Sequence, residues 1–239
     1  MSACCTIPPV KSDYSPKGEI FQIEDMDVYT VGPKGTKTAI LVIYDIFGFH
    51  PNTKQFADRL AEHSKVNVIM PDFFRGKPFT EQDLADKEKL MSWVQSAGSI
   101  KGMMPDLAKC KNFLQQDGAV SAGVVGFCWG AKIASQATAE DSFWGAAALI
   151  HPSFPAKEDA EKAGGPMLVI PTKDEPDMTE YMNALKAKPF GDKCKHERFD
   201  DVHHGFAAAR GDWSDETQAK RATQAIDLTS KFFNEHLKA

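Results

Sequence analysis

The chain has 239 residues, of which 42% are hydrophobic and 26% charged, enough for one α/β domain over residues 1–239 with a substantial core. Its net charge is −5 and its basic residues are scattered, which argues against nucleic acid or an anionic membrane as a partner. No apolar run approaches the length of about 18 residues that a membrane span needs. Residues 1–18 lack the apolar stretch of a signal peptide, so we expect a cytoplasmic protein with an extended N-terminal segment.

Apolar strands and amphipathic helices alternate along the chain. The expected strands cover residues 39–45, 66–72, 119–127, 143–152, 165–174 and 195–201. The expected helices cover residues 53–64, 81–98, 104–118, 179–187 and 216–237, with a further helix after residue 128. This alternation predicts an α/β fold with a mainly parallel central sheet and helices on both faces. Ligands bind such sheets at the carboxyl ends of the strands, where we look for reactive side chains.

One of these strand ends carries the sequence "GFCWG", with Cys128 between Gly126 and Gly130. This is the thiol form of the G-x-S-x-G turn, which exposes a nucleophile between a strand and a helix. The N-terminus of the following helix would favour the thiolate. The alternative is a buried core thiol, because free cysteine is among the residues most often buried. The other four cysteines are irregularly spaced and predict reduced thiols: Cys4, Cys5, Cys110 and Cys194.

Two later strand ends supply the partners that a nucleophilic cysteine needs. Asp174 lies in "VIPTKDEPD", and His203 and His204 lie in "RFDDVHHGF". The order nucleophile, acid, histidine is that of the α/β-hydrolase architecture, in which the histidine is the general base. We prefer His204 because Gly205 after it leaves room for the ring, and Asp177 is the alternative acid. Taken singly, such residues are more often turn residues, helix caps or solvated side chains.

Six segments together resemble the dienelactone hydrolase family, whose members use a cysteine nucleophile on the α/β-hydrolase fold. They are "DIFGFH", "VIMPDFFRGKP", "GVVGFCWGAK", "ALIHPSF", "PTKDEPD" and "HHGFAAARGDW", and the resemblance extends over nearly the whole chain. It implies Cys128 as nucleophile, His204 as base and Asp174 as the acid that orients the base. It also implies an oxyanion hole formed by the backbone N–H groups of Ile46 and Trp129.

The chain departs from this family at two positions. Asp45 stands where the bacterial members have a glutamate that contacts the resting nucleophile and takes part in its activation. Ala208 stands where they have an arginine that binds the substrate carboxylate, and Arg210 lies two positions later. The resemblance implies a carboxylate-binding role for Arg75 as well. A surface ion pair with a neighbouring acidic residue is the alternative for Arg75.

The function expected from these residues is hydrolysis of a small lactone or activated ester through a thioester acyl-enzyme, as in a carboxymethylenebutenolidase. No cofactor and no metal are expected, because the sequence lacks a zinc-type His or Cys spacing and a phosphate-binding loop. The partner is then a small molecule, and monomer and homodimer are both open.

Aromatic residues near the expected site, foremost Phe47 and Phe206, are candidates for an apolar substrate pocket, with core packing as the alternative. The others are Phe49, Phe73, Phe74 and Trp129.

Two other functions stay open for the chain as a whole. One is a redox protein whose Cys128 is oxidised to sulfenic acid. The other is a small-molecule binder that keeps the fold without turnover.

Overall fold

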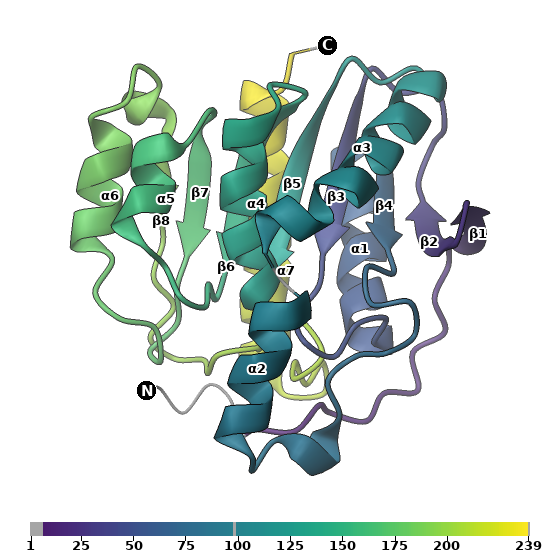
Figure 1. The fold of residues 1–239 in the computed structure, drawn as a ribbon, viewed down its shortest axis with the longest axis vertical. Helices are drawn as coiled ribbons and strands as arrows, with labels where there is room; N and C mark the ends of the chain where they lie inside the picture. The colour runs from purple at the N-terminus through teal and green to yellow at the C-terminus, as the bar shows by residue number, and fades with distance from the viewer. Residues whose placement is uncertain (1–6, 98, 239) are drawn as a thin grey trace.

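The computed structural model describes residues 7–97 and 99–238, whose strands form one eight-stranded sheet in the order β1-β2-β4-β3-β5-β6-β7-β8 (Figure 1). The strands are β1 (Glu19–Ile23), β2 (Met26–Val31), β3 (Thr38–Ile43), β4 (Asn67–Pro71), β5 (Ser121–Phe127), β6 (Trp144–Ile150), β7 (Met167–Ile170) and β8 (Lys195–His196). Strand β2 is antiparallel to both of its neighbours, and every other neighbouring pair is parallel. The predicted mainly parallel α/β sheet is therefore confirmed.

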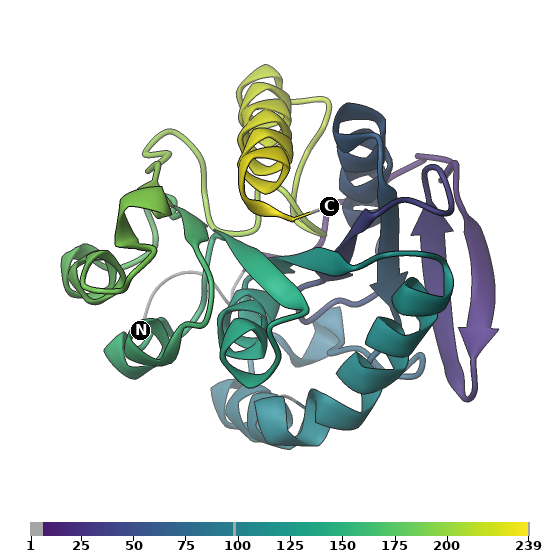
Figure 2. The same ribbon diagram turned by 90° about the horizontal axis from the view of Figure 1, so that it is seen from above.

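Helices cover both faces of this sheet, as the continuous apolar strands require. They are α1 (Pro51–Ser64), α2 (Lys87–Ala97), α3 (Ile100–Gln116), α4 (Trp129–Glu140), α5 (Lys157–Lys162), α6 (Thr179–Lys186) and α7 (Glu216–His236), with short 3-10 turns at Glu81–Asp83 and Gly191–Lys193. Figure 2 shows α1 and α7 on one face and α3 and α4 on the other. No helix in the described ranges is both long and apolar enough to cross a membrane.

The sheet differs from the sequence prediction at its edges. The β1–β2 hairpin was not predicted, because β1 is a largely exposed edge strand and lacks a continuous apolar run. The last strand keeps only two residues in the ladder, with an isolated bridge between Thr172 and Phe199. The helix expected over residues 81–98 begins only at Lys87, because the Asp86 carboxylate accepts the backbone N–H of Lys89 and sets a new helix start.

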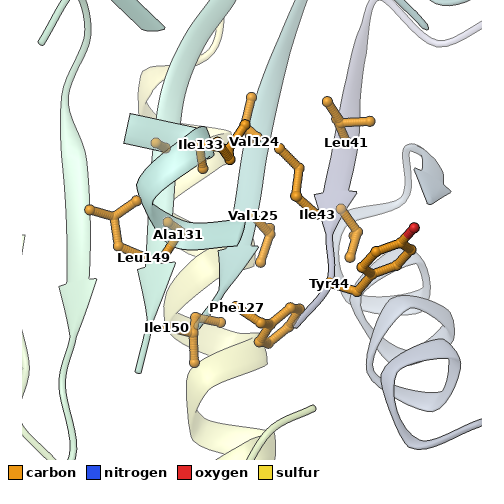
Figure 3. Packing of buried hydrophobic residues seen from close by; sticks show 14 of the residues in the cluster. Leu41, Ile43, Tyr44, Val124, Val125, Phe127, Ala131, Ile133, Leu149 and Ile150 are labelled. Atoms are coloured by element: carbon orange, nitrogen blue, oxygen red, sulfur yellow. The ribbon is translucent and has the colours of Figure 1, made fainter. Parts of the chain in front are cut away.

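Side chains of β3, β5, β6 and α4 pack together in the core that supports the site. Figure 3 shows Ile43 of β3, Val125 of β5 and Ile150 of β6 among these buried residues. In the parallel ladder Ile43 pairs with Gly126, and Phe127 pairs with Ile150. The three strands thus end at one edge of the sheet, the lower edge in Figure 1. The loops that follow them bring residues far apart in the sequence into contact.

Candidate active site

Cys128 occupies a sharp turn between β5 and α4. It is the N-cap residue of α4, with φ 55° and ψ −116°. A residue other than glycine with positive φ is strained, at a cost of about 1–3 kcal/mol, and such strain concentrates at functional sites. Glycine is required two positions later, because a Cβ on Gly130 would lie 2.3 Å from the carbonyl oxygen of Ile43. The turn places the sulfur at the sheet edge with 5% of the residue exposed.

Ser153 contacts the Cys128 sulfur from the loop after β6. The serine Oγ lies 3.1 Å from Sγ, and either atom can be the donor. The two backbones are joined as well, since the Ser153 N–H donates to the Cys128 carbonyl at 3.0 Å. This loop has positive φ at His151 (39°) and Phe154 (53°), so backbone strain is present on both sides of the serine. Sequence reasoning missed Ser153, although "HPSF" follows a predicted strand.

The imidazole of His204 is hydrogen-bonded to Glu175, which corrects the contact predicted for Asp174. Nδ1 of His204 lies 2.6 Å from Oε1 of Glu175, and both side chains are almost fully buried. Asp174 instead accepts the backbone N–H of His204 through Oδ2 at 2.8 Å. The expected strand over 165–174 ends at Ile170, and the turn after it directs Glu175 inward while Asp174 stays half-buried. The only sequence signal for the role of Glu175 was its place beside Asp174 in "KDEPD".

The two other candidates for these roles lie elsewhere. His203 is half-buried, and its Nδ1 lies 2.8 Å from the carbonyl oxygen of His204. Asp177 is exposed and accepts the backbone N–H of Thr179 at the start of α6. The glycine after His204 also has a different use from the one predicted. A Cβ on Gly205 would meet the side chain of Arg210, and its φ of +95° favours glycine.

Burial determines the protonation state of His204 and of the ionisable groups around it. Burial, together with the positive charge of Arg210, lowers the pKa of His204 to about 3, which favours the neutral ring. Burial also raises the pKa of Glu175. With the proton on Nδ1 and donated to Glu175, the lone pair is on Nε2, which has no hydrogen-bond partner among the described residues. A neutral imidazole with an open Nε2 is able to accept a proton.

His151 is a second fully buried histidine, packed against the first. The ring centroids of His151 and His204 are 4.8 Å apart, and the Phe206 ring packs against His151 with its centroid at 5.7 Å. Both ring nitrogens of His151 lack a hydrogen-bond partner in the described structure. Burial lowers the pKa of His151 well below its usual value, which favours its neutral form. Phe206, a predicted pocket residue, is 1% exposed and therefore part of the packing around these rings.

Asp45 joins the loop after β3 to the loop that carries His204. Its Oδ1 accepts the N–H of Phe47 at 3.0 Å, and its Oδ2 accepts the N–H of Ala209 at 3.3 Å. Burial raises the pKa of Asp45, and the charge of Arg210 opposes that rise. The guanidinium of Arg210 lies over the Phe47 ring, 4.8 Å from its centroid. Asp45 and Phe47 therefore hold two loops of the site together.

The remaining predicted site residues fall into two groups. Ile46 follows β3 and Trp129 begins α4 directly after β5, so their backbones lie at the carboxyl ends of two neighbouring strands. Arg75 is instead paired with acidic side chains. Its Nη1 and Nη2 donate to the two carboxylate oxygens of Asp106 at 2.6 and 2.8 Å, and its Nε donates to Asp25. This is the surface ion pair that the sequence left open as the alternative.

The described residues also bear on metals and disulfides. Within residues 7–97 and 99–238, no three His, Cys, Asp or Glu side chains gather as a metal-binding group. Cys110 and Cys194 are free thiols whose pKa values burial raises, which disfavours their reactive thiolates. Cys4 and Cys5 lie outside the described residues.

Comparisons with known proteins identify the family and the fold of this chain. A model of the dienelactone hydrolase family matches residues 26–237. An uncharacterized AIM2 family protein of Schizosaccharomyces pombe is 33% identical, over 98% of each chain. Dienlactone hydrolase 1 of Gibberella moniliformis is 28% identical, over 86% of this chain and 82% of its own. A crystal structure of a putative dienelactone hydrolase from Klebsiella pneumoniae has the same fold, with a TM-score of 0.66 at 19% identity, covering 86% of this chain and 92% of that one.

Proposed function

This chain belongs to the dienelactone hydrolase family, and from that premise we propose that it cleaves a small lactone or activated ester with Cys128 as nucleophile. The observation that carries the proposal is the placement of Cys128 on a strained strand-to-helix turn, on the same sheet edge as a buried neutral histidine. The name of the Gibberella relative supports a lactone as the substrate class.

The reaction begins with transfer of the Cys128 thiol proton to Nε2 of His204. The sulfur then forms a bond to the carbonyl carbon of the ester, and the carbonyl oxygen becomes an oxyanion. The backbone N–H groups of Ile46 and Trp129 donate to that oxyanion, a type of contact whose loss typically costs about 10²–10³ in rate. The C–O bond breaks, and the imidazolium returns its proton to the leaving oxygen. A thioester remains on Cys128.

The second half of the reaction hydrolyses this thioester. Nε2 of His204 takes a proton from water, and the water oxygen attacks the thioester carbonyl. The C–S bond then breaks, the acid product leaves and the sulfur regains its proton. Glu175 serves both halves, because its hydrogen bond to Nδ1 keeps the lone pair on Nε2 and stabilises the imidazolium. Asp174 acts on the backbone of His204 and sets the position of its loop.

Ser153 donates a hydrogen bond to the Cys128 sulfur when the thiolate is present. A hydrogen bond to a charged group contributes about 1.5–3 kcal/mol, and the contact at 3.1 Å is already formed in the resting protein.

A thiolate is also a good leaving group, so the tetrahedral adduct returns to substrate unless the alcohol leaves easily. Enol lactones and activated esters meet that condition, whereas peptides and unactivated fats do not. None of these steps uses a cofactor.

The test is hydrolysis of p-nitrophenyl acetate and a dienelactone by the wild type and by Cys128→Ala. We expect the substitution to abolish turnover without changing the circular dichroism spectrum, whereas Cys110→Ala and Cys194→Ala retain activity. Trapping of the acyl-enzyme by acid quench should add the acyl mass to Cys128. Peroxide consumption without ester turnover would instead assign Cys128 to redox chemistry. Absence of both activities would make the protein a binder.

A further inference from the structure

An apolar groove opens to solvent next to the Cys128 turn. It has a volume of about 360 Å³ and lies between α2, the start of α3, α4 and the loop after β6. Five apolar side chains form most of its wall: Met91, Val94, Ile100, Trp129 and Phe154. Trp129 directly follows Cys128, and Phe154 directly follows Ser153, whose hydroxyl contacts the sulfur. Two residues of the groove wall are therefore sequence neighbours of Cys128 and of its contact Ser153.

Two of these side chains are unusually exposed for their type. The structure exposes four large apolar residues among those described, and Met91 (36%) and Phe154 (45%) both line this groove. Phe154 also has a φ of 53°, so the chain accepts backbone strain where it presents this ring. Scattered single apolar residues are ordinary on a protein surface, but two in one concave site next to a nucleophile indicate a binding function.

The groove carries no charge available to a ligand. Its one charged lining residue, Lys132, donates to Asp159 at 2.6 Å and to the Phe154 carbonyl at 3.2 Å. Gln136, a polar lining residue, donates to the other Asp159 oxygen at 2.7 Å. The Arg75 guanidinium is occupied by Asp106 and Asp25. A carboxylate in this groove would find its nearest cation already neutralised, whereas a neutral apolar group would be well accommodated.

We propose that this groove binds the apolar part of a neutral ester, an alkyl chain or aryl ring, while the carbonyl is held at Cys128. This inference rests on the proposed function and gives it a substrate class. A fully buried methylene contributes about 0.8 kcal/mol, or about four-fold in affinity. Because the groove is open on one side, we expect about two-fold for each added methylene until the groove is filled.

The first experiment measures kcat/KM for two series of p-nitrophenyl-activated or enol esters, one with acyl chains from acetate to octanoate and one with lengthened alcohol groups. The wild type should show a rise with chain length in one series, which identifies the side of the ester that occupies the groove. The rise should be lost in the double variant M91S/F154N, whose asparagine tolerates positive φ. The controls are Ile20→Ser and Val120→Ser, which remove the two exposed apolar residues outside the groove and should keep the wild-type rise.

A second experiment separates this inference from the proposed function. Calorimetric titration with octanamide and butanamide, which need no turnover, should give at least ten-fold tighter binding of octanamide to the wild type and no difference in M91S/F154N. Flat chain-length profiles in both series, with equal binding of the two amides, would overturn the groove assignment even if Cys128 hydrolyses acetate esters. A wild-type dimer that M91S/F154N converts to monomer, without any chain-length effect, would assign the groove to a second copy instead.

Discussion

Nδ1 of His204 lies 2.6 Å from Oε1 of Glu175, and both side chains are buried beneath the loops at the carboxyl edge of the sheet. The neighbouring carboxylate, Asp174, bonds to the backbone of the same histidine. Two adjacent acidic residues thus hold one histidine at different atoms. The arrangement separates control of the ring's tautomer from control of the loop's position, and each can be tested by a single substitution.

Glu175→Gln should reduce kcat by about 10³–10⁴-fold with little change in KM. The second Glu175 oxygen accepts the backbone N–H of Thr172, so the one oxygen of glutamine cannot serve both that N–H and Nδ1 of His204. Asp174→Asn should cost much less, since the side chain keeps an oxygen that can accept the His204 N–H. Steady-state kinetics on a chromogenic ester measure both. If Asp174→Asn loses most of its kcat while Glu175→Gln stays near the wild-type value, Asp174 is the acid that orients His204.

Ser153→Ala should raise the apparent pKa of Cys128 alkylation by iodoacetamide and lower kcat/KM by about 10- to 150-fold, because the thiolate loses a donor. Ser153→Thr keeps the hydroxyl and should restore much of the activity. Ser135→Ala is the matched control, since that buried serine bonds to Tyr181 away from the sulfur. An unchanged alkylation profile in Ser153→Ala would remove Ser153 from the chemistry.

The free energy of unfolding should fall as the pH drops below 6.5. His204 and His151 have lower pKa values in the folded protein than in the unfolded chain. Below pH 6.5 the unfolded chain therefore binds more protons than the folded protein, which favours unfolding. Each contributes up to about 1.4 kcal/mol per pH unit in this window, and their stabilisation is complete only above 6.5. Proton uptake by Glu175, whose pKa burial raises, offsets part of the slope at the acid end.

His151→Asn isolates one of these contributions, because asparagine tolerates the positive φ at this position and does not titrate. Urea unfolding at pH 7, 6 and 5 should give a slope smaller than that of the wild type by up to about 1.4 kcal/mol per pH unit, the contribution of one histidine. The same slope in both proteins would mean that His151 is protonated in the folded state.

Arg75→Ala should affect a carboxylate-bearing lactone and its neutral methyl ester equally. The guanidinium is paired with Asp106 in two hydrogen bonds. The substitution therefore removes a partly exposed ion pair, which lowers the free energy of unfolding by about 1 kcal/mol, and does not remove a substrate contact. Thermal unfolding and kcat/KM on both compounds provide the measurement. A loss of about 10-fold or more confined to the carboxylate compound would place Arg75 in the substrate site.

The sequence by itself determined the fold class and the family. Continuous apolar strands separated by helices can be buried only in a parallel sheet covered on both faces, and the observed sheet has that form. The glycines around Cys128 likewise predict a sharp strand-to-helix turn, because Gly130 packs against the backbone of the neighbouring strand. These features depend on local pattern and backbone space, which a sequence displays directly.

Only the tertiary structure decided which side chains meet at that turn. The sequence places both Asp174 and Glu175 at one strand end, but the turn after Ile170 determines which of them faces the His204 ring. Ser153 reaches the sulfur because β5 and β6 are neighbours in the sheet, although 25 residues separate it from Cys128. The apolar groove is formed by residues of α2, α3, α4 and the loop after β6, which lie far apart in the sequence. Contacts between distant segments follow from packing and from the direction of each loop, and a linear pattern carries neither.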